Sequence, residues 1–177
     1  MNERIELVKD TISNEDMDEL REWLGTYPRL TQASLVKEFE EKYAEWNGSK
    51  YAVMVNSGSS ANLLMAYYLR ECHTLKNRKV VVPAISWATT VMPWMQFNFD
   101  PILCDADSTH LGVSLTHLEE LFEKHNPAVL MLVHVLGFPC DMKQIKSLCE
   151  KYDVILLEDC CEPRDRHTMK SRLEISA

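Results

Sequence analysis

The segment Asn56–Asn62 combines a glycine with small hydroxyl side chains directly after an apolar run. Gly58 allows a ligand to approach the backbone closely, or allows a positive φ angle. Ser59 and Ser60 begin a helical pattern, and the free N–H groups at a helix N-terminus favour a phosphate group. The segment has neither the Gly-Lys-Ser/Thr of a Walker A loop nor the spacing of G-x-G-x-x-G. A phosphate site and an ordinary serine-rich helix start are therefore both open interpretations.

Trp87 and Asp159 follow two other apolar runs in the same way. Trp87 falls at the turn into a helical stretch, where its indole could lie on a planar heteroaromatic ring. Glu158 and Asp159 are adjacent acids at the end of a strand pattern, so they point to opposite faces and one can face a ligand. A buried carboxylate needs a cationic partner, and a protonated ring nitrogen would serve. The alternatives are a core or interface tryptophan and two solvent-facing acids.

Asp105 and Asp107 form an Asp-x-Asp motif that could hold a divalent metal ion against a nucleotide-sugar diphosphate. Turn-forming aspartates in a solvated loop are the other interpretation. His134, also at the end of an apolar run, could contact a ligand or make structural hydrogen bonds. The six cysteines show no C-x-x-C spacing, so we expect no zinc site and assign no metal ligands.

These segments are joined by a regular alternation of short apolar runs and single helical stretches. The alternation predicts βαβ units and a mostly parallel sheet that is sandwiched by helices, with ligands beyond the carboxyl ends of the strands. The expected strands are 51–55, 79–82, 100–104, 128–133 and 154–157, and the expected helices are 59–72, 86–97, 116–125 and 141–152.

Capping signals mark several helix ends. Ser13–Asp16 resembles a capping box before a helix that Gly25 and Pro28 end, and Thr116 with Glu119 forms a second one. Asp141 is a good N-cap. A further helix over 34–46 is closed by Asn47-Gly48, so residues 1–48 form an N-terminal helical segment.

The overall composition narrows the class of protein. The 177 residues carry a net charge of −8 and the pI is about 5.2, which argues against a protein that coats nucleic acid or anionic lipid. The first residues lack the apolar region of a secretory signal, and the longest apolar runs are too short to cross a membrane. We therefore expect a cytoplasmic protein with reduced thiols.

Taken together, these motifs resemble the DegT/DnrJ/StrS family of pyridoxal phosphate-dependent enzymes, which act on nucleotide-linked keto-sugars. The similarity covers roughly residues 5–162 in the same order. It rests on residues 30–40, 50–53, 56–62, 82–83, 134–137 and 155–162, together with Trp87.

The resemblance implies the α/β large domain of the aspartate aminotransferase-like fold, fold type I. Its cofactor would be pyridoxal 5'-phosphate, with backbone N–H groups of Gly58 and Ser59 on the phosphate. Trp87 would stack on the pyridine ring, Asp159 would pair with the protonated ring nitrogen, and Glu162 would lie near the cofactor.

The same resemblance implies partners and a pathway. Full-length relatives would be homodimers that use a nucleotide-linked keto-sugar and an amino donor such as glutamate, in amino-sugar or deoxy-sugar biosynthesis for surface polysaccharide. The sequences Asn-Ser-Gly-Ser-Ser-Ala-Asn and Cys-Cys-Glu look closer to the branch of sugar 3-dehydratases than to many aminotransferases.

The resemblance also predicts what this chain lacks. The Schiff-base lysine, or the histidine of the dehydratase branch, would lie beyond the chain end, so no catalytic residue is assigned. We expect an incomplete large domain over 49–162, a non-native or disordered tail over 163–177, and no catalysis by the truncated chain. Two other classes remain open: a metal-dependent, glycosyltransferase-like domain that uses Asp105 and Asp107, and a non-catalytic fragment.

Overall fold

The computed structural model describes residues 11–161. The chain divides into two compact units, residues 1–39 and 40–177, and each is described by itself. None of the helices in the described part is long and apolar enough to cross a membrane.

Two helices dominate the N-terminal region. Helix α1 (Asn14–Gly25) begins with the expected capping box: Ser13 Oγ accepts from the Asp16 N–H at 3.2 Å, and Asp16 Oδ2 accepts from the Ser13 N–H at 2.8 Å. Helix α2 (Ser34–Asn47) is followed by Gly48, whose φ of 72° lies in the left-handed region that favours glycine. Both helix ends therefore confirm the capping signals in the sequence.

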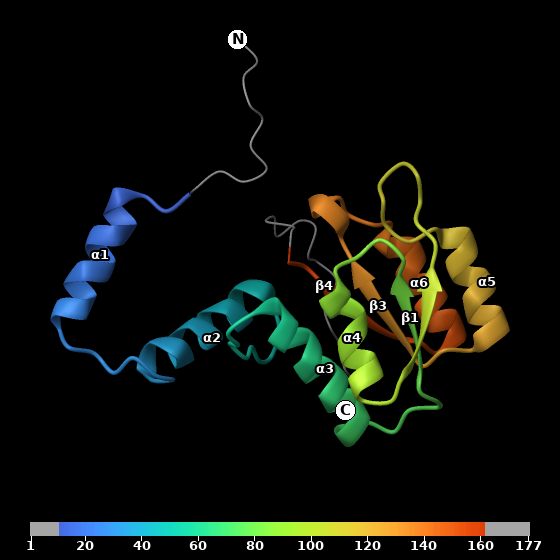
Figure 1. Ribbon diagram of the computed structural model, residues 1–177, viewed down its shortest axis with the longest axis horizontal. Helices are drawn as coiled ribbons and strands as arrows, with labels where there is room; N and C mark the ends of the chain where they lie inside the picture. The colour runs from blue at the N-terminus through green and yellow to red at the C-terminus, as the bar shows by residue number, and fades with distance from the viewer. Residues whose placement is uncertain (1–10, 162–177) are drawn as a thin grey trace, which may run out of the picture. The chain divides into compact units, whose positions relative to one another are not determined.

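The second unit is built on a sheet of four strands in the order β2-β1-β3-β4, and all of its pairings are parallel. Its elements alternate between helix and strand along the chain (Figure 1). They are α3 (Gly58–Cys72), β1 (Lys79–Pro83), α4 (Ala88–Gln96), β2 (Asp100–Cys104), α5 (Leu115–His125), β3 (Val129–Val133), the short 3₁₀ helix η1 (Val135–Gly137), α6 (Met142–Tyr152) and β4 (Ile155–Asp159).

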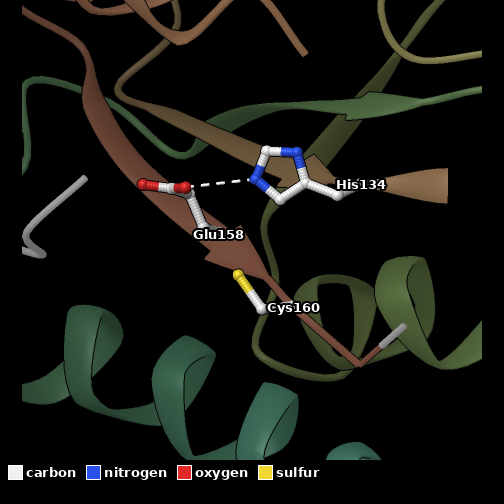
Figure 2. A group of neighbouring side chains, drawn as sticks. All are labelled: His134, Glu158 and Cys160. Atoms are coloured by element: carbon white, nitrogen blue, oxygen red, sulfur yellow. Dashed lines mark hydrogen bonds and ion pairs between the residues drawn. The ribbon is translucent and has the colours of Figure 1, made fainter. Parts of the chain in front are cut away.

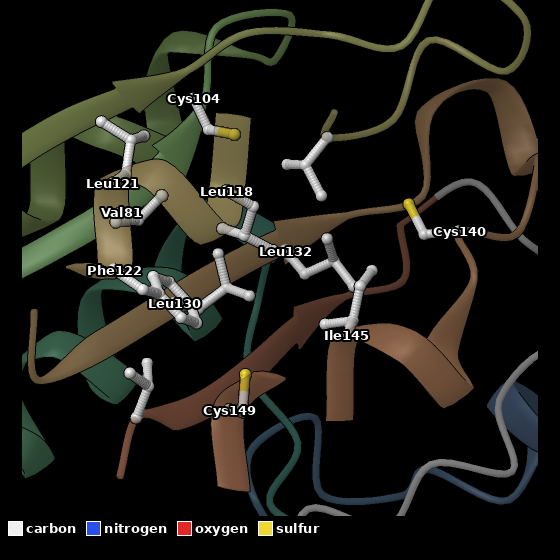
Figure 3. Packing of buried hydrophobic residues seen from close by; sticks show 12 residues of the cluster. Val81, Cys104, Leu118, Leu121, Phe122, Leu130, Leu132, Cys140, Ile145 and Cys149 are labelled. Atoms are coloured by element: carbon white, nitrogen blue, oxygen red, sulfur yellow. The ribbon is translucent and has the colours of Figure 1, made fainter. Parts of the chain in front are cut away.

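Successive strand residues supply two separate cores, one on each face of the sheet. Val81, Leu130 and Leu132 face α5 and α6, where they pack with Leu118, Phe122 and Ile145 (Figure 3). Val80, Val129 and Met131 belong to the other cluster, with Ala66 and Leu69 of α3 and Trp94 of α4. The period-2 alternation of strand side chains thus buries both faces, which confirms the expected sheet sandwiched by helices.

One expected strand is absent from this sheet. Residues 51–55 are irregular, and the N–H of Met54 donates to Glu40 Oε1 at 2.8 Å rather than to a neighbouring strand. Tyr51 and Val53 are exposed. A short apolar run becomes a strand only where a partner strand accepts its backbone hydrogen bonds, and the prediction was wrong because the described chain offers none there.

The predicted cap of helix α5 was also wrong. The helix begins at Leu115, and Ser114 is the N-cap, with its Oγ accepting from the His117 N–H at 3.4 Å. Ser114 and Thr116 both stand at the start of the same apolar pattern, so the pattern alone could not identify which of them is the N-cap. Asp141 is confirmed as the N-cap of α6, since its Oδ1 accepts from the Gln144 N–H at 3.1 Å.

Replacing Leu130 by Ala should lower the free energy of unfolding by about 2–5 kcal/mol, because its side chain is fully buried and would leave a cavity. The matched control is Leu103→Ala on β2, where the leucine is 57% exposed and the loss should stay under about 1 kcal/mol. Urea denaturation followed by circular dichroism measures both. Equal losses in the two variants would contradict the assigned core.

The cap of α6 should make stability depend on pH. Hydrogen bonds from the side chain and backbone of Gln144 lower the pKa of Asp141, so its stabilising contribution is present above the unfolded-state pKa and is lost as the pH falls through the folded-state pKa. Between about pH 5 and about pH 3, stability should therefore fall more steeply in the wild type than in Asp141→Asn, which keeps an uncharged cap. Parallel urea midpoints over that range would refute the assignment.

Candidate functional site

The first part of the site is the N-terminus of helix α3. Ser57 is the N-cap, and its Oγ accepts from the Ser60 N–H at 3.2 Å, while Ser60 Oγ donates to Asn56 Oδ1 at 2.6 Å. Gly58 and Ser59 are the first two helical residues, where helix geometry leaves the backbone N–H groups without an acceptor inside the helix. The first turn carries no acidic side chain, so it is electrostatically suited to an anion.

Gly58 has no conformational reason to be glycine. Its φ is not positive, so of the two uses of a glycine that the sequence left open, the positive φ is excluded and the close approach of a ligand is compatible with the geometry. A Cβ placed on Gly58 would meet no protein atom within 4 Å. The space beside this backbone is therefore open to a ligand.

Trp87 lies at the N-cap position of helix α4, after the carboxyl end of β1. Its side chain is 78% exposed, whereas Trp94 on the same helix is fully buried in the core. Trp87 is therefore not a core residue, and Trp94 is the tryptophan of this helix that packs in the core. An exposed indole at a strand end leaves its ring face available for stacking.

Asp159 is the last residue of β4 and points to the face of the sheet that α3 covers. Its Oδ2 accepts from Asn62 Nδ2 at 2.9 Å, and its Oδ1 accepts from the Cys161 N–H at 3.1 Å. Asn62 Nδ2 also donates to the carbonyl oxygen of Thr89 at 3.3 Å. The amide of Asn62 thereby brings together α3, the segment after Trp87 and the end of β4.

Sequence reasoning missed Asn62, although the chain contains a signal for it. Asn62, Ala66 and Leu69 are the buried residues of α3 and follow one another at helical spacing. A polar side chain in such an apolar stripe must find hydrogen-bond partners when the helix packs. Ser59 and Ser60 precede Asn62 by three and two residues on the helix, and together with Thr89 they line a pocket of about 210 Å³ between α3 and α4. Glu162 lies outside the described residues.

Glu158 and His134 form a separate buried pair (Figure 2). Because successive strand residues point to opposite faces, Glu158 lies on the other side of β4 from Asp159. The side chain of His134 is 1% exposed and that of Glu158 is 7% exposed, and His134 Nε2 lies 3.2 Å from Glu158 Oε2. The Cys140 N–H donates to His134 Nδ1 at 3.3 Å, so the ring proton lies on Nε2 and is donated to Glu158. His134 therefore makes the structural hydrogen bonds that were one of its two expected roles.

This arrangement also decides against a metal ion at the pair. Cys160 joins His134 and Glu158 in a group whose possible ligand atoms lie within 4.8 Å of one another. A metal ion on Nε2 would move the ring proton to Nδ1, directly against the Cys140 N–H. Burial by itself would lower the pKa of His134, but hydrogen bonds involving Cys140, Cys160 and Glu158 outweigh burial and raise this pKa overall. The group is best described as a hydrogen-bonded link between β3 and β4.

Asp105 and Asp107 serve their own loop. Asp107 Oδ1 accepts from the Thr109 N–H at 2.7 Å and from the Thr109 hydroxyl, and these bonds lower the pKa of Asp107. Asp105 Oδ1 accepts from the Ala106 N–H at 2.9 Å. The two carboxylates therefore act as turn-forming aspartates, and the metal-dependent alternative is not favoured.

The cysteines of the described chain are free thiols, and two of the buried ones are held in an unreactive state. All six lie in the described part of the chain and none is bonded to another. Burial raises the pKa of Cys104 to about 12, and it does the same for Cys149. Both thiols are therefore protonated near neutral pH and act as core side chains.

Comparisons with known proteins find similar enzymes. Over 136 residues the chain is 38% identical to the GDP-4-keto-6-deoxy-D-mannose 3-dehydratase of Yersinia pseudotuberculosis, which is 75% of this chain and 34% of that enzyme. It is 27% identical to the GDP-perosamine synthase of Escherichia coli O157:H7 over 160 residues, which is 89% of this chain and 42% of that enzyme. The chain thus spans less than half the length of these relatives.

Solved structures place the fold. The E. coli GDP-4-keto-6-deoxy-D-mannose-3-dehydratase, solved with bound hydrated PLP, matches with a TM-score of 0.80 and 33% identity over 88% of this chain and 40% of that one. The Helicobacter pylori aminotransferase PseC matches in fold with a TM-score of 0.75 at 22% identity, over 85% of this chain and 40% of that one. The expected fold is confirmed as an aspartate aminotransferase-like, fold type I large domain of which the chain holds a part.

The family itself is recognised over nearly the whole chain. Residues 10–166 match the DegT/DnrJ/EryC1/StrS aminotransferase family, and this range includes every strand and helix of the sheet unit as well as the site residues that the structure describes. The chain therefore belongs to the DegT/DnrJ/EryC1/StrS aminotransferase family.

Proposed function

We propose that this chain is the N-terminal, cofactor-binding part of a pyridoxal phosphate-dependent enzyme that acts on a nucleotide-linked keto-sugar. The observation that carries the proposal is the bridge made by Asn62, which joins the end of β4 to α3 and to the segment after Trp87. It holds an acid, a helix N-terminus and an aromatic side chain on elements that meet at the carboxyl edge of a parallel sheet.

The residues present fit the chemistry of the cofactor. The N–H groups of Gly58 and Ser59 would bind its phosphate, because the open space at Gly58 and the helix N-terminus both favour an anion there. The exposed indole of Trp87 would support the aromatic ring, and the carboxylate of Asp159 would hold a proton on the ring nitrogen. When bound, the protonated cofactor ring supplies an electron sink for bonds broken at the substrate.

The chain's own residues would bind and orient rather than react. Asp159 would keep the proton on the ring nitrogen, and the first turn of α3 would anchor the phosphate. Glu162 would lie near the cofactor. No residue of the described chain is assigned the proton-transferring role, which we propose belongs to a residue of the complete enzyme outside this chain.

The substrate class follows from the relatives. Among the solved relatives, one GDP-4-keto-6-deoxymannose-3-dehydratase structure contains GDP-perosamine and another a trapped PLP-glutamate geminal diamine. By analogy we infer a GDP-linked 4-keto-sugar as substrate and glutamate as amino donor. The two relatives at 38% identity are both 3-dehydratases, which favours removal of a hydroxyl group over amino transfer. The pathway would be deoxy-sugar or amino-sugar synthesis for a surface polysaccharide.

We further propose that the complete enzyme is a cytoplasmic homodimer that binds neither nucleic acid nor membrane. In support, α3 exposes the apolar side chains of Leu63, Leu64, Tyr67 and Tyr68, and a contiguous exposed apolar surface is typical of a protein–protein contact. The six unbonded cysteines suit a reducing compartment, and the net charge of −8 disfavours anionic partners.

The direct test is binding of pyridoxal 5'-phosphate to the 177-residue chain by equilibrium dialysis, with Gly58→Ala as the informative variant. A methyl group on Gly58 meets no protein atom, so its unfolding free energy should stay unchanged or rise slightly. The same methyl group would occupy the space beside the phosphate-binding N–H groups, so affinity should fall about tenfold or more. Unchanged affinity in a folded Gly58→Ala variant would contradict the phosphate site.

Trp87 offers a second test of the same proposal. Trp87→Ala should weaken pyridoxal 5'-phosphate binding roughly 2- to 10-fold, since an aromatic pair contributes about 0.5–1.5 kcal/mol beyond its buried area. Trp87→Phe keeps a stacking ring and should restore most of the affinity. Trp46→Ala is the control for loss of a partly exposed indole elsewhere. If Trp46→Ala weakens binding as much as Trp87→Ala, then Trp87 does not contact the cofactor.

A further inference from the structure

We propose that Asn62 is a positioning residue, which fixes the carboxylate of Asp159 in the orientation required to pair with a cationic ring nitrogen. The inference rests on the proposed cofactor site and adds to it a residue that would not touch the cofactor. It assigns a function to one of the three buried polar side chains in the described part of the chain.

The orientation of the Asn62 amide is fixed by its surroundings. Nδ2 lies 2.9 Å from a carboxylate oxygen of Asp159 and 3.3 Å from the carbonyl oxygen of Thr89, and both of these atoms are acceptors. Turning the amide over would place its own oxygen against two other oxygens and leave both without a donor. The NH₂ group therefore must point to them, and its two hydrogens match the two acceptors.

The carboxylate of Asp159 is in turn held from two directions. Asn62 donates to Oδ2 and the Cys161 N–H donates to Oδ1, so rotation about the Cβ–Cγ bond would break both hydrogen bonds. Each carboxylate oxygen accepts more than one hydrogen bond, so both retain capacity for a further donor. The pair of donors thus sets the plane of the carboxylate without using up its ability to bind a cation.

Besides the orientation of the Asp159 carboxylate, Asn62 restrains the spacing between the elements that carry the proposed cofactor contacts. Thr89 lies in the first turn of α4, two residues after Trp87, and Ser59 precedes Asn62 by nearly one turn of α3. The side chain is only 4% exposed, and an unpaired amide at such a position would be costly. Its hydrogen bonds therefore restrain the three proposed cofactor contacts relative to one another.

A purely structural role would produce a different result from a positioning role, and a double-mutant cycle separates the two. The measured quantity is the dissociation constant of pyridoxal 5'-phosphate, obtained by equilibrium dialysis on the 177-residue chain. The variants are Asn62→Leu, which removes both donors at similar volume, Asp159→Asn, and the double variant. Thr90→Val is the control, because Thr90 is another buried polar residue in the same helix layer.

Asp159→Asn should weaken binding roughly 10- to 100-fold, as expected for losing a hydrogen bond between charged groups. Asn62→Leu should weaken it roughly 3- to 10-fold in the wild-type background but less than about 2-fold in the Asp159→Asn background. Thr90→Val should change it less than about 2-fold. If Asn62→Leu destabilises the fold, Asn62→Gln keeps the amide and should recover part of the lost affinity.

The outcomes distinguish failure of the inference from failure of the function. Equal losses from Asn62→Leu in both backgrounds, or no loss in either, would show that Asn62 does not act through Asp159, while the cofactor site would stand. No binding by the wild-type chain, or full binding by Asp159→Asn, would overturn the proposed function together with the inference built on it.

Discussion

Parallel pairing of short strands is the constraint on which the rest of this structure depends. Because β1, β3 and β4 run in the same direction, Pro83, Val133 and Asp159 finish at one edge of the sheet. The central strands β1 and β3 are buried almost throughout, so polar side chains gather at the strand ends and in the segments beyond that edge. The buried sheet and the position of the candidate site residues therefore both follow from the parallel pairing of the strands.

Alternation along β4 then gives its two terminal acids different tasks. Leu156 and Leu157 pack in opposite cores, and the alternation continues into Glu158 and Asp159. Glu158 meets His134 in a buried pair that links β3 to β4, while Asp159 meets Asn62 beneath α3. Shifting the strand by one residue would exchange these partners, so the register of β4 is as important to the site as the acid itself.

Sequence patterns predicted what depends on local periodicity and failed where a distant partner decides. Four of the five expected strands lie within two residues of those observed, because a short apolar run between turn residues is typical of a buried strand. Residues 51–55 have a similar pattern but find no strand to pair with. Asn62 was missed for the same reason, since its partner Asp159 is 97 residues away. The opposite facing of Glu158 and Asp159 was correctly predicted, since it follows from strand geometry alone.

The residues that packing does not explain are the most informative about ligands. Gly58 has an ordinary helical backbone and open space at its Cβ position, so neither conformation nor crowding within the protein requires glycine there. Trp87 leaves most of its indole in water, although burial of a tryptophan elsewhere on α4 shows that the core can accept one. If Gly58 and Trp87 served folding alone, other residues could replace them with little loss of stability. The proposed cofactor, which has a phosphate group and a flat ring, would give both residues a common role, and Asp159 would complete the proposed site.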